Sequence, residues 1–361
     1  MEISRELKDR LAPWGFDLDQ LETFAERCRH PLHLNIVKGE LAVPRPGDVH
    51  PLPARGTDAH AWLSSLGRQA LASQQVGVVI LAGGMATRFG GVVKAVVPVL
   101  EQRTFLQLKL DDVRAIAPDA PVFVMSSFAT HERLLEHVRE LGAKNVEVFP
   151  QFVSLRLTPE GTPFIEPDGD VSPYATGHGD FTWAMRRCGA LERFRKNGGR
   201  LLVMSNVDNL GATLDPAVLG AHLERKVALT AEVVRKVKGD KGGAPARLDG
   251  RVQIIEGFRF PPTFDQDSIP VFNTNTFVMD AAAIDRDFPL PFYRVEKKVD
   301  GAVAIQFERL VGELTAYLET AFVEVPREGA ESRFLPAKDP DELQSRLETI
   351  RLVTSSRTHT R

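Results

Sequence analysis

A continuous apolar run followed at once by a glycine-rich loop constrains this chain more than any other feature. The run VGVVILAG covers residues 76–83 and is rich in β-branched side chains, the pattern of a strand buried on both faces of a parallel sheet. Further apolar segments at 121–127, 145–149 and 200–208 alternate with helical patterns such as 105–116. Strands separated by helices predict a mostly parallel sheet with right-handed crossovers. We therefore predict a doubly wound α/β fold with helices on both faces.

The N-terminal segments predict short helices and an extended connector. Residues 1–30 predict two amphipathic helices around Pro13 and Gly15. Prolines are frequent between residues 44 and 56, where neither a helix nor a central strand is favoured. Residues 58–74 then predict a helix that leads into the first strand.

Two later segments predict departures from the β–α alternation. Residues 228–236 and 251–258 predict antiparallel strands, joined by the hairpin-like segment between them. Residues 301–320 predict a helix, because apolar residues recur there on one helical stripe; they are Phe307, Leu310, Val311, Leu314 and Leu318.

Composition excludes several classes of protein. A formal net charge of −3 argues against a surface that coats nucleic acid. The chain has two cysteines, Cys28 and Cys188, which disfavour a disulfide framework or a cysteine zinc site and fit a reducing compartment. No apolar stretch is long enough to span a membrane, and the charged start MEISRELKDR is unlike a signal peptide. We expect a cytoplasmic protein that binds neither nucleic acid nor membrane.

The loop after the first strand has the residues of a phosphate site. Glycines stand at 83, 84, 90 and 91, and missing side chains allow backbone N–H groups to approach an anion. Arg88 and Lys94 bring two cations to the same loop, at the carboxyl edge where open α/β sheets bind ligands. The spacing fits neither GxGxxG nor the P-loop pattern. A glycine-rich surface turn remains the alternative.

Several blocks in the chain resemble one enzyme family. LAGGMATRFG with Lys94 resembles the nucleotide-binding signature of sugar-nucleotide pyrophosphorylases. Five further matches follow in order, and the block at 204–215 is very near that of UTP–glucose-1-phosphate uridylyltransferases; they are VMSSFATHE (124–132), YATGHGDFTWA (174–184), MSNVDNLGATLD (204–215), FNTNTF (272–277) and KKVDGAVAIQFERLVG (297–312). A seventh segment, VPREGAESRFLPAKDPDEL (325–343), resembles the family's closing block with an insertion.

The resemblance implies both a fold and a reaction. It implies a Rossmann-like nucleotidyltransferase sheet at 76–325 with an antiparallel sugar-binding subregion, an N-terminal helical and connector region at 1–75, and a short extension at 326–361 in place of the family's C-terminal β-helix. The implied reaction is attack of glucose 1-phosphate on the α-phosphorus of UTP, giving UDP-glucose and pyrophosphate. A phosphate monoester is largely ionised near pH 7, so no serine or histidine base is required. Without the β-helix we expect a monomer or a weak oligomer.

Roles for individual residues follow from the same resemblance. Arg88, Lys94 and Lys297 are expected to contact the phosphates at the reacting centre. A carboxylate at a strand end suits Mg²⁺ that bridges phosphate oxygens, which assigns Asp208 to the metal and the nucleotide. The other expected nucleotide contacts are Leu81, Ala82, Gly83, Gly84, Gln151, which would read the uracil edge, and Gly179. The expected sugar-phosphate contacts are His178, Asn206, Asn209, Glu232, Gly243 with Lys241 from the same loop, Asn273 and Asn275.

Some positions depart from the family pattern. Ala86 stands where a glycine is usual, and Val93 replaces the proline before Lys94, so the reach of that lysine is open. Two other functions also stay open. One is a uridylyltransferase for another sugar 1-phosphate, such as an N-acetylhexosamine, and the other is a nucleotide-binding regulator without turnover.

Overall fold

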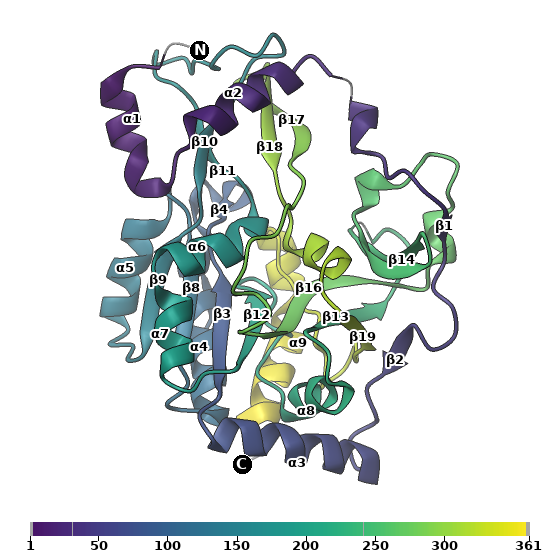
Figure 1. Ribbon diagram of the computed structural model, residues 1–361. Coiled ribbons are helices and arrows are strands. Elements are labelled where there is room, and N and C mark those ends of the chain that lie inside the picture. The colour runs from purple at the N-terminus through teal and green to yellow at the C-terminus, as the bar shows by residue number, and fades with distance from the viewer. Residues whose placement is uncertain (1–2, 31, 241, 359–361) are drawn as a thin grey trace.

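The computed structural model describes residues 3–30, 32–240 and 242–358, and a mixed eight-stranded sheet lies at the centre of these residues (Figure 1). In spatial order its strands are β2 (Val49–Pro51), β19 (Thr320–Glu324), β13 (Leu229–Arg235), β16 (Val271–Asp280), β12 (Leu201–Asn206), β3 (Val76–Leu81), β8 (Val122–Ser126) and β9 (Val146–Pro150). All neighbours pair in parallel except β16, which runs antiparallel between β12 and β13. The predicted mostly parallel α/β sheet is confirmed.

Helices cover both faces of the sheet, as its two-sided burial requires. Every residue of β3 is buried, because even positions such as Val78 belong to one apolar core and odd positions such as Val79 to the other. The first core includes α3 (Asp58–Ala72), α4 (Phe105–Ile116), α5 (His131–Glu140), α8 (Pro216–Arg225) and α9 (Pro340–Thr358). The second core, on the front face in Figure 1, includes α6 (Phe181–Arg187), α7 (Ala190–Lys196) and η8 (Val311–Ala316).

A third apolar core joins the N-terminal helices to the region above the sheet. Phe24 is buried there and stacks on Phe307, with ring centroids 4.5 Å apart. Its elements include α1 (Arg5–Leu11), α2 (Leu18–Arg27), β10 (Val153–Leu155) and β18 (Ala302–Glu308). The strands β11 (Pro173–Ala175) and β17 (Tyr293–Val299) pair with β10 and β18, respectively. The two predicted N-terminal helices and the helix at 58–74 are confirmed, whereas the proline-rich connector also contributes the edge strand β2.

The predicted pairing of the antiparallel subregion is wrong. The segment at 228–236 is β13, a strand of the main sheet, and it does not pair with β15 (Arg251–Ile255). Instead β15 pairs with β14 (Ala244–Leu248), which lies in the segment expected to be a loop, and β1 (Leu41–Ala42) adds a third strand. Asp249 and Gly250 both have positive φ in the tight turn, the geometry that an Asp-Gly hairpin favours.

The predicted helix at 301–320 is also wrong. The chain forms strand β18, the 3-10 helix η8 and strand β19 there. Asp300 and Gly301 have positive φ and close the β17–β18 hairpin. The apolar residues that suggested one helical stripe belong to different cores, since Phe307 packs in the third and Leu314 in the second.

Short elements complete the described residues. The strands are β4 (Met85–Ala86), β5 (Val92–Val93), β6 (Pro98–Leu100) and β7 (Arg103–Thr104). The 3-10 helices are η1 (Ala12–Trp14), η2 (Leu32–Asn35), η3 (Thr87–Phe89), η4 (Lys94–Val96), η5 (His178–Asp180), η6 (Gly257–Arg259) and η7 (Gln266–Ser268). The domain boundaries at 75 and 325 stay predictions.

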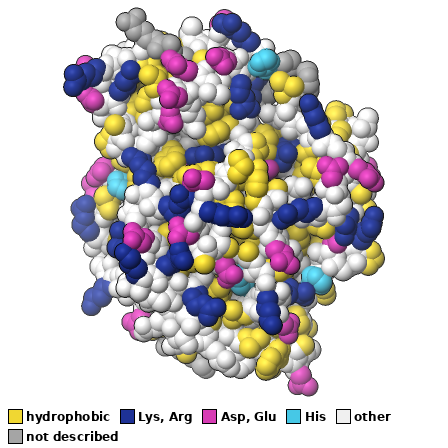
Figure 2. Space-filling view, viewed as in Figure 1, with side chains coloured by type: hydrophobic (Ala, Val, Ile, Leu, Met, Phe, Trp, Pro, Cys, Tyr) yellow, Lys and Arg dark blue, Asp and Glu magenta, His cyan; other side chains and the backbone are white. Residues whose placement is uncertain are grey.

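The surface in Figure 2 mixes both signs of charge. Lys and Arg side chains lie among Asp and Glu on this face rather than in one field, and apolar side chains gather near its middle. Within the described ranges, none of the helices has the length and hydropathy needed to cross a membrane.

Candidate functional site

The glycine-rich loop folds back on itself at the carboxyl end of β3. Leu81 and Ala82 are buried, and the Ala82 N–H donates to the Met125 carbonyl. The loop then forms the β4–β5 hairpin, whose turn uses the positive φ of Gly90 and Gly91. Lys94 follows the hairpin, and its N–H donates to the Gly84 carbonyl at 3.3 Å. The hairpin therefore places the backbone of Lys94 beside Gly84.

Gly83 lies in close contact with the side-chain amide of Gln151. A Cβ on Gly83 would lie 2.3 Å from Gln151 Nε2, closer than any real contact allows. Gln151 is buried, and its backbone N–H donates to the Ser126 carbonyl at 2.9 Å. The structure thus brings together two residues predicted to bind the nucleotide.

Lys94 and Asp208 form an ion pair across the sheet edge. Lys94 Nζ donates to Asp208 Oδ2, and both side chains are largely buried but reach solvent. Lys94 therefore reaches Asp208, and its contact with the nucleotide stays a prediction. Arg88 lies farther out, with its Nη1 3.9 Å from Asp339 Oδ2 at the start of α9.

Asp180 ties the segment after Gln151 to the turn that carries His178. Its buried carboxylate accepts hydrogen bonds from the Phe152 N–H at 3.0 Å and from Thr176 Oγ1, and it pairs with Arg309. Gly179 packs so closely on the strand end that a Cβ would lie 2.6 Å from Arg309 C. This packing explains the glycine, and its contact with the nucleotide stays a prediction.

His178 has one defined tautomer. Its Nδ1 accepts a hydrogen bond from the Val311 N–H at 3.1 Å, so Nε2 carries the hydrogen of the neutral ring. Burial lowers the pKa of His178 to about 4, and the Glu308 carboxylate opposes that shift. The side chain is therefore a neutral hydrogen-bond donor near pH 7.

Lys297 projects from the β17–β18 hairpin. Its Nζ lies 3.7 Å from Glu308 Oε1, and 46% of its side chain is exposed. Because Glu308 also acts electrostatically on the neutral His178 ring, these three side chains interact with one another on the side of the site formed by the hairpin and η8.

Three of the predicted asparagines are linked where β16 bulges away from β13. Asn275 Nδ2 donates to Asn206 Oδ1 at 2.9 Å, and the Asn275 N–H donates to Asn273 Oδ1 at 3.0 Å. Asn275 adopts a positive φ of 57°, which asparagine tolerates better than most residues. The bulge therefore directs amide groups toward the end of β12.

Asn209 and Glu232 lie deeper and bind the C-terminal segment. Asn209 Oδ1 accepts from the Leu335 N–H at 2.8 Å, and Nδ2 donates to the Arg333 carbonyl. Both carboxylate oxygens of Glu232 accept from the Arg333 guanidinium, and both side chains are buried. The structure gives these two residues structural contacts, and their contacts with a sugar stay predictions.

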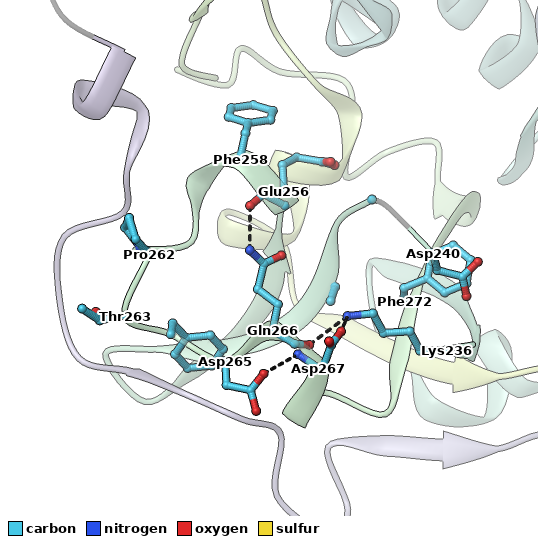
Figure 3. A pocket seen from close by; sticks show the side chains of 14 residues that line it. Lys236, Asp240, Glu256, Phe258, Pro262, Thr263, Asp265, Gln266, Asp267 and Phe272 are labelled. Carbon is cyan, nitrogen blue, oxygen red and sulfur yellow. Dashed lines mark hydrogen bonds and ion pairs between the residues drawn. The ribbon is translucent and has the colours of Figure 1, made fainter. Parts of the chain in front are cut away.

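Gly243 lies against a carboxyl group that the sequence did not single out. A Cβ on Gly243 would lie 2.8 Å from Glu256 Oε1, and the Gly243 carbonyl accepts from the Asn273 N–H. Burial and the neighbouring Glu313 raise the pKa of Glu256 to about 7. A cavity of about 930 Å³ lies here (Figure 3), and its lining includes Glu256 and the two chain neighbours of Gly243, Gly242 and Ala244. In that view Glu256 lies near the top, and Lys236 and Phe272 lie on the right. Lys241 lies outside the described residues.

Comparisons with known proteins agree with this fold. The structure of a UDP-glucose phosphorylase from Trypanosoma brucei is 23% identical with a TM-score of 0.74, over 93% of this chain and 76% of that one. A uridine diphosphate N-acetylglucosamine pyrophosphorylase from Trypanosoma brucei is 17% identical with a TM-score of 0.76, over 96% of this chain and 79% of that one. The protein therefore has an α/β fold of the nucleotidyltransferase type.

Sequence comparisons define the family. The family model described as UTP–glucose-1-phosphate uridylyltransferase matches residues 47–357, so the chain belongs to this family. A relative of that name from Pyrus pyrifolia is 30% identical over 76% of this chain, and UTP–glucose-1-phosphate uridylyltransferase 2 from Dictyostelium discoideum is 29% identical over 75%. The chain spans 62% and 58% of the lengths of these two relatives.

Proposed function

We propose that this chain transfers a uridylyl group from UTP to glucose 1-phosphate, forming UDP-glucose and pyrophosphate. The names of its curated relatives support this activity. The observation that carries the proposal most directly is the meeting of Lys94 and Asp208 beside Gly83 and Gln151. A cation, a carboxylate and a buried amide at one sheet edge suit a triphosphate and a uracil ring.

Charge neutralisation and positioning account for the chemistry. An oxygen of the sugar 1-phosphate forms a bond to the α-phosphorus of UTP as the bond to the pyrophosphate oxygen breaks. The nucleophile is already ionised at neutral pH, since the second pKa of a phosphate monoester is about 6. Lys94 and Lys297 would approach the two anions from different elements, which lowers their repulsion and keeps them in line. His178 would donate its Nε2–H without carrying charge.

We include Mg²⁺ in the proposal, with Asp208 as its protein ligand. Asp208 offers one carboxylate whose side chain is 18% exposed, a donor that suits an ion held mainly by phosphate oxygens and water. No cluster of three or more metal-ligating side chains occurs in the described part of the chain. When bound, the ion would neutralise charge on the phosphate oxygens. Lys94 would then exchange Asp208 for a phosphate oxygen.

Pyrophosphate release separates the candidate functions. The enzyme would be incubated with UTP, Mg²⁺ and one sugar 1-phosphate, and pyrophosphate would be measured with glucose, galactose and N-acetylglucosamine 1-phosphates. Turnover with glucose 1-phosphate supports the proposal. Turnover only with the N-acetyl sugar favours the second candidate, which the resemblance of the fold to an N-acetylglucosamine pyrophosphorylase suggests. UTP binding without pyrophosphate release from any sugar would identify a regulator. A cytoplasmic location and a monomeric or weakly oligomeric state stay parts of the proposal.

Gly83→Ala is expected to raise the KM for UTP by about tenfold or more, because the new methyl group displaces the Gln151 amide from the base. The turnover number should change much less, since the reacting phosphates lie elsewhere. Steady-state kinetics with UTP as the varied substrate checks this. Gln151→Ala removes the amide itself, so it should raise the KM for UTP to a similar extent. An unchanged KM in Gln151→Ala would contradict the role of Gln151.

The KM for glucose 1-phosphate is expected to rise about threefold to tenfold as the pH falls from 8 to 6. With a pKa of about 7, Glu256 loses its charge over this range, and a carboxylate accepts hydrogen bonds from sugar hydroxyls more strongly than a carboxylic acid does. Glu256→Gln should retain only the smaller dependence that comes from the phosphate itself.

The free energy of unfolding should decrease as the pH rises, whereas binding of glucose 1-phosphate should improve. Because the pKa of Glu256 is raised on folding, its contribution to the free energy of unfolding is present at low pH and is lost as the pH rises from about 4.5 through about 7. Thermal unfolding of Glu256→Gln should lose this part of the pH dependence. A wild-type KM that is flat between pH 8 and pH 6 would remove Glu256 from the sugar site.

A further inference from the structure

The most unexpected charged group inside the protein is Lys109. It lies on the apolar face of α4, beside Leu106, Leu110 and Val113, and only 4% of it is exposed. An ammonium ion in such surroundings is strongly unfavourable unless its hydrogens are bonded. A lysine at this position therefore needs a compensating set of acceptors.

Three acceptors of Lys109 belong to the segment that carries Asn206 and Asp208. Lys109 Nζ donates to Ser205 Oγ at 2.8 Å, to the Asn209 carbonyl at 3.1 Å and to the Ala212 carbonyl. Ser205 directly precedes Asn206, and Asn209 directly follows Asp208, so the bonds bracket the polar residues at the end of β12.

The same helix also binds the end of this segment. Asp112, one turn after Lys109, accepts a hydrogen bond from the Leu214 N–H at 3.3 Å. Helix α4 thus supplies donors to the carbonyls of the segment and an acceptor to its N–H group. Because buried backbone groups need partners, the conformation of residues 205–214 depends on these two side chains.

We propose that Lys109 is a positioning residue, which fixes the backbone of residues 205–212 so that Asp208 and Asn206 face the phosphates. This inference rests on the proposed function, because the phosphates are those of its substrates. Lys109 itself lies behind the sheet edge, with its ammonium used by the protein. It acts through the segment and not by touching substrate.

Lys109→Met tests the proposal, since methionine fills the space of the lysine stem but has no ammonium. Hydrogen exchange followed by mass spectrometry should show amides of residues 206–212 exchanging about tenfold faster or more. Binding of UTP with Mn²⁺, measured by calorimetry, should weaken, and turnover should fall on the order of 100-fold. Ser205→Ala removes a single acceptor, leaves the helix unchanged and should give the same changes at smaller size.

A variant that destabilises the same core away from residues 205–212 provides the control. Val138→Ala removes buried methyl groups from α5, in the same core but far along the sheet from β12. It should lower the unfolding temperature while exchange at 206–212, binding and turnover remain those of the wild type. A merely structural role for Lys109 would make Lys109→Met resemble Val138→Ala, and that outcome overturns the proposal.

The exchange experiment does not depend on turnover. If the wild type releases no pyrophosphate, the proposed function fails. Hydrogen exchange at residues 206–212 and Mn²⁺-dependent binding of UTP then still test the role of Lys109. If Lys109→Met does not fold, Ser205→Ala decides: unchanged exchange in that variant counts against the proposal, and faster exchange at 206–212 alone supports it.

Discussion

Asp208→Asn is expected to lower turnover on the order of 100-fold to 1000-fold. The amide keeps the size of the carboxylate but cannot hold Mg²⁺ with a full charge, and it leaves Lys94 in a largely buried place without its anion. Steady-state kinetics over a range of Mg²⁺ concentrations checks the expectation. The deficit should persist at saturating Mg²⁺, because the geometry of the ion is lost as well as its affinity.

Binding of UTP in the absence of a divalent ion distinguishes a metal-binding role of Asp208 from a general loss of structure in the variant. Without a divalent ion, UTP should bind Asp208→Asn at least as tightly as the wild type, because the variant has lost a carboxylate that repels the triphosphate. Calorimetry with and without Mn²⁺ measures this. Asp287→Asn, which changes an exposed carboxylate paired with Arg186, is the control for charge. Weaker binding of UTP to Asp208→Asn in the absence of metal would contradict the assignment.

Lys297→Met is expected to reduce turnover on the order of 1000-fold while the unfolding temperature stays within about 2 °C of the wild type. The side chain is half exposed and pairs with Glu308 at 3.7 Å, and such surface pairs contribute little to stability. Its proposed contribution is made at the reacting phosphates, where no other residue of the hairpin would replace it.

The neighbouring lysine provides the matched control for this variant. Lys298 is exposed on the same strand and alternates to the other side of the hairpin. Lys298→Met should therefore retain the turnover of the wild type. Comparable losses in both variants would mean that the hairpin acts through its overall charge, and unchanged turnover in Lys297→Met would remove that residue from the site.

The buried parallel strands could be predicted from sequence, and the hairpins were missed for one physical reason. Runs such as 76–83 have no alternative to burial, so pattern alone identifies them. At Asp249–Gly250 and Asp300–Gly301 the decisive signal is a two-residue turn, which periodicity over longer windows conceals. In the segment 301–320 the spacing of apolar residues matched that of a helix, although Phe307 and Leu314 pack into different cores.

The candidate site divides in a similar way. Residues within motifs, such as Gly83, Lys94 and Asp208, are brought together as the motif order suggested. Glu256 and Lys109 were missed because their partners come from distant segments. For Lys109 one signal was present, a lysine on the apolar stripe of the helix at 105–116. For Glu256 the raised pKa depends on burial that only the folded chain provides.

The candidate site depends on residues near the C-terminus, Arg333 and Ala337, which are synthesised after its other residues. The Ala337 N–H donates to the Asp208 carbonyl at 3.3 Å, and Arg333 neutralises Glu232 inside the first core. A chain still on the ribosome can form β3, β8 and β12 before these residues emerge, but Glu232 then has no counter-charge and Asp208 lacks its last backbone bond. We therefore expect the backbone bond of Asp208 and the ion pair of Glu232 to form only after residues 333–337 have left the ribosome.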